Sequence, residues 1–238
     1  DIIKIESIRE ARMLEPAIGY IRMSDFHENT ARDLEAALVQ LKEQGVEGLV
    51  IDLRNNPGGL LDVAVSTSEL FLDRHDLIVS TKGRLKNQNL EFRSRRQGLV
   101  KDLPIVVLAN EGSASASEIV AGALQDHGRG IIVGMKTHGK ASVQTIFPMK
   151  DGSALRLTTS SYFTPRGRSI EGEGIAPDVL VPFEPPPKPE EDSVKSEEVF
   201  QEIERPEGGE TNPKPMDSQL TRAVDLLKGI RAYRASRA

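Results

Sequence analysis

Two apolar runs, Gly48–Leu53, in which only Asp52 is charged, and Leu103–Ala109, each lead into a loop of small and polar residues and then into a helical pattern. An apolar run of this length is typical of a strand that is buried on both faces. Apolar residues spaced three and four apart predict a helix that begins at Thr30 and ends at Gly45, and further helices at Leu60–Leu72 and Ser115–His127. This alternation predicts a layered α/β domain.

The pattern changes in the second half of the chain. Further strands are predicted at Leu77–Thr81 and Gly130–Gly134, and beyond Gly134 the helical patterns stop. Apolar and polar residues then alternate at Ser142–Pro148 and Ala154–Tyr162, which is typical of antiparallel strands. We therefore expect a mixed sheet.

The last part of the chain differs in composition from the rest. Residues 184–210 hold ten acidic and three basic residues, and eight of the 14 prolines lie between Pro182 and Pro215. Such a composition predicts an extended linker, which we place at 184–216. An amphipathic helix is predicted at 217–238, docked either on its own domain or on a second subunit. Its apolar residues are Met216, Leu220, Val224, Leu227 and Ile230.

Composition excludes several kinds of chemistry. Cysteine is absent, so there is no disulfide, thiolate metal site or cysteine nucleophile. The four histidines form no zinc motif, and we expect neither metal nor cofactor. The basic stretch from Lys82 to Lys101 contains a single aromatic residue, Phe92, so we expect a solvated hairpin and no nucleic-acid partner. No apolar run approaches the roughly 18 residues that a membrane span needs.

The segment NEGSASASE, residues 110–118, lies between a predicted strand and a predicted helix. Free backbone amides at a helix N-terminus stabilise negative charge, so a serine at this junction is placed to act as a nucleophile. The same residues also fit a capping box, in which Ser115 and Glu118 satisfy the first helical amides. The segment alone leaves both interpretations open.

Lys140 favours the nucleophile. The strand from Gly130 returns along the helix Ser115–His127, so the chain arrives near the helix start at about Thr137 to Lys140. A lysine amine that has lost its proton can serve as the base for a serine hydroxyl. Gln144, four residues on, is predicted on the same strand face, where it can orient the amine. The alternative is a solvated surface lysine.

Adjacent glycines follow the other apolar run, in DLRNNPGG at residues 52–59. Glycine lets backbone amides approach a ligand closely. An amide of Gly58 or Gly59, together with that of Ala116, would complete an oxyanion hole. A simple Pro-Gly turn explains the motif equally well.

A competing motif contains the same lysine. Residues 134–140 match the G-x-x-x-x-G-K pattern of a phosphate-binding loop. The next residue is Ala141, where such loops need a hydroxyl for Mg²⁺, and the following residues alternate like a strand. A nucleotide-binding protein is therefore the weaker alternative.

Taken together, the motifs resemble the C-terminal processing proteases, also called tail-specific proteases, which use a serine–lysine dyad. The resemblance covers Gly19 to Pro182 in the segments GYIRMSDF, DLRNNPGG, NEGSASASEI, ALQDHGRG, THGKASVQ and SYFTPRGRSIEGEGIAPDV. It implies a layered core of the crotonase or Clp-protease kind. The family's functional positions fall on Ser115 as nucleophile, Lys140 as base, Gln144 as supporting glutamine, Gly58 or Gly59 with Ala116 as oxyanion hole, and Asp126, which we expect to position the turn into Gly130.

The resemblance also implies a function and a domain plan. We expect an endopeptidase that cuts near the C-termini of unstructured or partly folded proteins, in an extracytoplasmic bacterial setting such as the periplasm, with a homodimer through the C-terminal helix. Such enzymes carry a PDZ domain before the core. We expect no PDZ domain in this chain. Residues 1–18 are expected to be the remaining connection to that domain, and residues 19–183 to be the protease core. A non-catalytic peptide-binding module on the same fold is the alternative.

Overall fold

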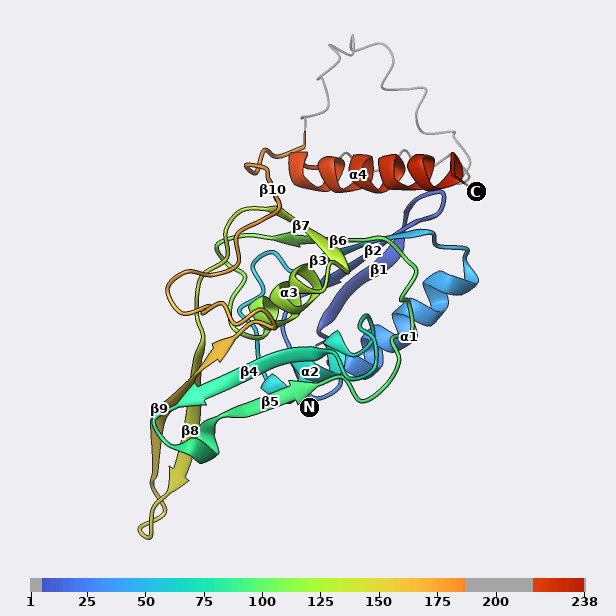
Figure 1. Cartoon of the computed structure of the whole chain (residues 1–238). Coiled ribbons are helices and arrows are strands. Elements are labelled where there is room, and N and C mark those ends of the chain that lie inside the picture. Colours follow the sequence, from blue (N-terminus) through green and yellow to red (C-terminus); the bar gives the residue numbers. More distant parts are fainter. Residues whose placement is uncertain (1–5, 187–215, 238) are drawn as a thin grey trace, which may run out of the picture.

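A six-stranded sheet forms the centre of the computed structural model, which describes residues 6–186 and 216–237 (Figure 1). The first two strands pair antiparallel, and every later neighbour in the sheet is parallel. The mixed α/β architecture expected from the sequence is therefore confirmed. In spatial order the strands are β1 (Ile8–Glu15), β2 (Ile18–Met23), β3 (Gly48–Asp52), β6 (Ile105–Ala109), β7 (Gly130–Gly134) and β10 (Val179–Leu180).

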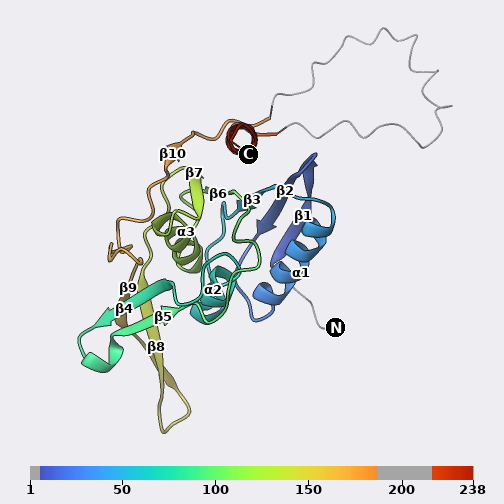
Figure 2. The ribbon, with the colours of Figure 1, turned by 45° about the vertical axis from the view of Figure 1, so that its right-hand side comes forward.

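Helices cover both faces of this sheet. On one face lie α1 (Thr30–Glu43), α2 (Leu61–Ser68) and α3 (Ala116–Asp126), and on the other lies α4 (Ser218–Ala235), as Figures 1 and 2 show. Successive side chains of a strand point to opposite faces. In β3, Leu49 and Ile51 accordingly belong to the core under α1–α3, and Val50 belongs to the core under α4. Burial on both sides explains the apolar runs.

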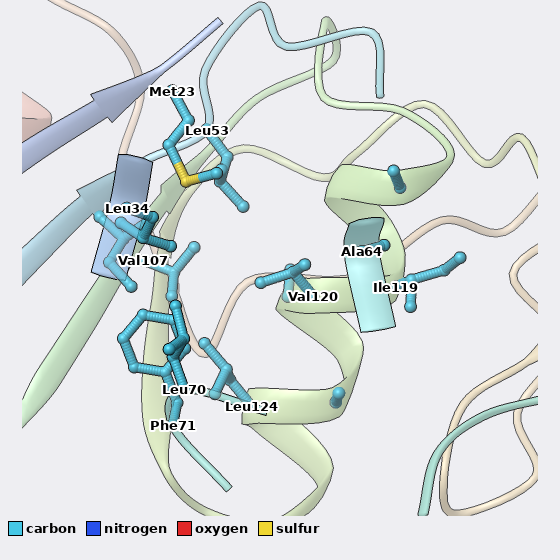
Figure 3. Packing of buried hydrophobic residues seen from close by; sticks show 14 of the residues in the cluster. Met23, Leu34, Leu53, Ala64, Leu70, Phe71, Val107, Ile119, Val120 and Leu124 are labelled. Atoms are coloured by element: carbon cyan, nitrogen blue, oxygen red, sulfur yellow. The ribbon is translucent and has the colours of Figure 1, made fainter. Parts of the chain in front are cut away.

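The larger core lies between the sheet and α1–α3. Figure 3 shows Val107 of β6 beside Leu34 of α1, with Val120 and Leu124 of α3 next to Leu70 and Phe71. The loop after α2 contributes three consecutive side chains, Leu70, Phe71 and Leu72, each 0% exposed. Helix α2 ends at Ser68 instead of at Leu72 as predicted, and these three residues follow it in a turn and a bend.

A second, antiparallel sheet lies below the helices in Figure 1. Its strand order is β5 (Leu90–Arg93), β4 (Leu77–Gly83), β9 (Ala154–Phe163) and β8 (Ser142–Pro148). The two strands predicted from the alternating pattern, β8 and β9, pair with each other and project as a ribbon, on which Ile146 and Leu157 remain exposed. The basic stretch forms a hairpin between β4 and β5, which a short 3-10 helix, η1 (Lys86–Gln88), connects.

Helix α4 docks on its own domain, one of the two alternatives that the sequence left open. Leu220, Val224 and Leu227 are buried against the sheet. The start of α4 is fastened to the chain after β10, because Ser218 N–H donates to the Glu184 carbonyl oxygen (3.1 Å) and Glu184 N–H donates to Ser218 Oγ (2.9 Å). Most of the predicted linker, 187–215, lies outside the described residues.

Two further predictions concern the N-terminal part and membranes. Of the expected connection 1–18, residues 1–5 lie outside the described part, and Ile8–Glu15 is the edge strand of the central sheet. Within the ranges 6–186 and 216–237, no helix has the length and apolarity needed to cross a bilayer.

Candidate functional site

Three loops meet at the carboxyl ends of β3, β6 and β7, which are adjacent parallel strands. The loop after β3 contacts the loop after β6 where Ala114 N–H donates to the Asn56 carbonyl oxygen (3.0 Å). The loop after β7 joins them where His138 N–H donates to the Ser113 carbonyl oxygen (3.0 Å). The three segments that the sequence singled out thus lie side by side, at the sheet edge where α/β proteins commonly place their sites.

Ser115 stands at the junction of the β6 loop and α3 in a strained conformation. Its φ of 55° and ψ of −112° fall outside the extended region that an N-cap residue normally adopts. Strain of about 1–3 kcal/mol at a non-glycine residue persists only where the surroundings impose it, and it concentrates at functional sites. Ser115 is partly exposed.

The two neighbouring serines have structural roles. Ser113 Oγ donates to the Leu53 carbonyl oxygen (2.7 Å), and Ser117 Oγ donates to the Asn56 carbonyl oxygen (2.9 Å). Both side chains are buried and fasten the β6 loop to the β3 loop.

Glu118 connects Ser115 to the lysine loop. It is 0% exposed, and its carboxylate accepts four hydrogen bonds. Oε2 accepts from the backbone N–H groups of Ser115 (2.8 Å) and Lys140 (2.9 Å). Because both groups bind the same oxygen atom, the two backbone nitrogens lie close together. Oε1 accepts from Thr137 Oγ1 (2.6 Å) and Gly139 N (2.7 Å). One carboxylate therefore fixes both candidate segments relative to each other.

The side chains of Lys140 and Gln144 are exposed. Among the described residues, neither side chain makes a hydrogen bond with Ser115 or with the other. Lys140 precedes β8, and the register of β8 against β9 shifts between Val143 and Gln144, which interrupts the simple alternation used to place Gln144 on the face of Lys140. The structure brings the Lys140 backbone to Ser115, and the side-chain pair stays a prediction.

The two glycines of the β3 loop differ in what their amides do. Gly58 N–H donates to Asn56 Oδ1 (2.9 Å), so this amide is already engaged. In the described part of the chain, the N–H groups of Gly59 and Ala116 make no hydrogen bond. Of the alternatives for the oxyanion hole, the arrangement favours Gly59 with Ala116.

Gly58 is nevertheless required by its surroundings. It has a φ of +95°, and an added Cβ would lie 2.6 Å from the Ala114 carbonyl oxygen and 2.8 Å from Ala116 N. We expect Gly58→Ala to lower the unfolding free energy by several kcal/mol, about 1–2 from the left-handed backbone and the rest from the clash. Urea denaturation measures the loss. Gly45→Ala is the control, because Gly45 has a φ of +77° with nothing within 4 Å; equal losses in both variants would contradict this account.

Asp126 serves a different turn from the one predicted. Its carboxylate accepts a hydrogen bond from Arg166 N (2.8 Å) and pairs with the Arg168 guanidinium. Both partners lie in the turn after β9 and not in the turn into Gly130. Asp126 lies at the far end of α3, eleven residues from Ser115, or about 16 Å along the helix.

The phosphate-loop alternative is not supported. Residues 134–140 follow β7 as expected, but Ser142–Pro148 forms strand β8 and not the helix whose N-terminus would hold phosphates.

Sequence reasoning recognised Glu118 only as half of a capping box and missed its contacts with Thr137, Gly139 and Lys140. It also missed the pair in which Asn55 N–H donates to Asn110 Oδ1 (2.8 Å). The one available signal was the acidic residue inside an otherwise small and apolar helix start. Such a carboxylate, when buried, needs several donors.

A serine at a strained strand-to-helix junction, beside glycine-rich backbone, is the arrangement of the serine hydrolases. The chain belongs to peptidase family S41, whose family model matches residues 17–181. A carboxy-terminal-processing protease of Bartonella bacilliformis is 49% identical over 185 residues, covering 76% of this chain and 42% of that protein. A carboxyl-terminal-processing protease of Synechocystis sp. is 39% identical over 213 residues, covering 90% and 44%.

Among solved structures, the photosystem II D1 C-terminal processing protease is similar, with a TM-score of 0.68 and 34% identity. The match covers 76% of this chain and 49% of that one. The chain thus spans less than half the length of these relatives.

Proposed function

We propose that this chain is the catalytic core of a serine endopeptidase that cuts near the C-termini of unstructured or partly folded proteins. Membership of a peptidase family and the names of its relatives support the reaction class. The observation that carries the proposal is the strained Ser115, tied through Glu118 to the backbone of Lys140.

In the proposed reaction, the Lys140 amine takes the proton of Ser115 Oγ as this oxygen attacks the scissile carbonyl carbon. The N–H groups of Gly59 and Ala116 stabilise the oxyanion of the tetrahedral intermediate. Lys140 then returns the proton to the leaving amine as the C–N bond breaks. A water molecule, deprotonated by the same amine, then attacks the carbonyl carbon of the acyl-enzyme ester. Lys140 returns this proton to Ser115 Oγ as the ester C–O bond breaks, which frees the carboxylic acid product and restores the serine.

The reaction requires the exposed Lys140 side chain to turn from solvent toward Ser115. Its backbone is already held beside Ser115 by Glu118, so rotation about side-chain bonds is the movement we propose. Gln144 is proposed to accept from the amine in that orientation and to aim its lone pair.

The remaining expectations are also proposals. Substrates are proteins with accessible C-termini, and the extracytoplasmic location follows from the family resemblance alone. A homodimer through α4 would have to use the outer face of that helix, where Tyr233 is 58% exposed, because the inner face covers the chain's own sheet.

Mass spectrometry of an unstructured protein incubated with this chain tests the proposal. We expect fragments that accumulate from the C-terminal region, and none with the Ser115→Ala variant. Binding of the substrate without any cleavage would overturn the peptidase and favour a binding module. Fragments formed equally by the Ser115→Ala variant would overturn the role of Ser115.

A further inference from the structure

A buried cluster of charges joins the β3 loop to the start of α4. Arg54 follows β3, and its side chain is only 11% exposed. Nε and Nη2 donate to the Asp52 carboxylate, the shortest contact being 2.7 Å. Nη1 donates to both oxygens of Asp217, each at 2.9 Å, and to Gln219 Oε1 at 3.0 Å. A single guanidinium therefore bridges two segments that are 163 residues apart.

The α4 side of this bridge is held by further contacts. Asp217 is the N-cap of α4, and its Oδ1 accepts from Leu220 N (2.9 Å). Gln219, which is 0% exposed, donates through Nε2 to the Val181 carbonyl oxygen (2.8 Å). Because the cap residue is also the ion-pair partner, Arg54 contacts Asp217 in this geometry only while α4 is docked.

The other side of the bridge leads to the candidate site. Leu53 and Asn56, on either side of Arg54, accept hydrogen bonds from Ser113 Oγ and Ser117 Oγ, the serines that flank Ser115. Asn56 also accepts from Gly58 N, next to the proposed oxyanion amide of Gly59. A shift of Arg54 would therefore move the loop that holds both the glycines and the serine junction.

The cluster is poorly tolerant of losing a partner. Asp52 is 1% exposed and also accepts from Tyr20 Oη (2.8 Å). Burial alone would lower the pKa of Arg54, but its hydrogen bonds with Asp52 and the charges of Asp52 and Asp217 outweigh burial and raise it. The cluster holds one cation against two carboxylates, so removing Arg54 would leave both carboxylates without their cation. Removing the charge of Asp217 leaves the Arg54–Asp52 pair intact but weakens the contact that ties this loop to α4.

We propose that Arg54 is a positioning residue, which makes the geometry of the Gly58–Gly59 loop depend on the docking of α4 through Asp217. The effect on loop geometry does not depend on the proposed function. Only the effect on activity rests on that function. The helix that follows the acidic, proline-rich segment is then a structural part of the site, although it contributes no side chain to the chemistry.

Amide hydrogen exchange in the intact chain tests the coupling without reference to activity. Asp217→Asn removes the charge, and asparagine remains a good N-cap. Asp225→Asn is the matched control, since it makes the same substitution at an exposed position of the same helix and leaves the docked face unchanged. We expect the amides of Asn55 and Gly58 to exchange at least tenfold faster in Asp217→Asn. In Asp225→Asn, these loop amides should exchange as in the original chain.

Arg54→Lys is the second variant, because lysine keeps the charge but cannot bridge two carboxylates in a fork. It should give faster exchange at the same amides, Asn55 and Gly58. It therefore also tests the coupling if Asp217→Asn does not fold. Unchanged loop exchange in either folded variant, or an equal increase in Asp225→Asn, would overturn the coupling.

Activity gives a separate readout. If cleavage is observed, Asp217→Asn should lower kcat about tenfold with KM within twofold, while Asp225→Asn keeps kcat near its original value. If the chain does not cleave peptides at all, the proposed function fails, and the exchange result still decides the coupling.

Discussion

Replacing Ser115 by alanine should lower kcat/KM for an unstructured protein substrate by a factor on the order of 10⁴ or more. Replacing Lys140 by alanine should cost nearly as much, and the double variant should lose little beyond either single variant. The reason is that nucleophile and base act as a unit, so once one is removed the other contributes nothing. Steady-state cleavage of one peptide by all four proteins measures the effect.

Two controls separate this result from general damage. Lys136→Ala removes another exposed lysine of the same loop, and Ser66→Ala removes a partly exposed serine of α2; both should retain cleavage. Losses that add up independently in the Ser115→Ala/Lys140→Ala double variant would show that the two residues do not cooperate. A fully active Lys140→Ala variant would remove the base from the proposed reaction.

Glu118→Gln should have the next largest effect, a loss of at least a hundredfold in kcat/KM. The carboxylate is an acceptor at both oxygens, whereas glutamine turns one of them into an NH₂ donor. That donor would face either the backbone N–H groups of Ser115 and Lys140, or the hydroxyl of Thr137 and the N–H of Gly139. Each buried donor left without an acceptor costs about 1–3 kcal/mol, and the two loops separate.

The measurement is a comparison with Glu111→Gln, which changes an exposed glutamate of the same loop. This control should leave cleavage and the thermal midpoint unchanged. If Glu118→Gln is folded and keeps its activity, the carboxylate does not hold the two loops in their reactive arrangement.

The sequence predicted those parts of the fold whose signal is local. The apolar runs of β3 and β6 and the helical spacing of α1 and α3 can each be recognised within one short stretch of sequence. The same applies to the strand-loop-helix junction at Ser115, since a strand, a small-residue loop and a helix follow one another in the sequence.

Contacts between distant segments carried no such signal. Nothing in the residues near Arg54 indicates that Asp217 is its partner, because the pairing depends on where α4 docks. The orientation of the Lys140 side chain was equally out of reach, since four rotatable bonds and an exposed position leave its direction to the surroundings. The partners of Asp126 were out of reach for the same reason, because they come from the later turn at Arg166 and Arg168.

Covalent labelling tests most directly whether Ser115 is a nucleophile activated by Lys140. A fluorophosphonate reacts when a serine oxygen attacks phosphorus and fluoride leaves, so the adduct stays on the nucleophile. Peptide mapping of the labelled chain should locate a single adduct on Ser115, formed much more slowly in Lys140→Ala and absent in Ser115→Ala. An adduct on another residue, an unchanged rate in Lys140→Ala, or no adduct on the original chain would contradict the proposed mechanism.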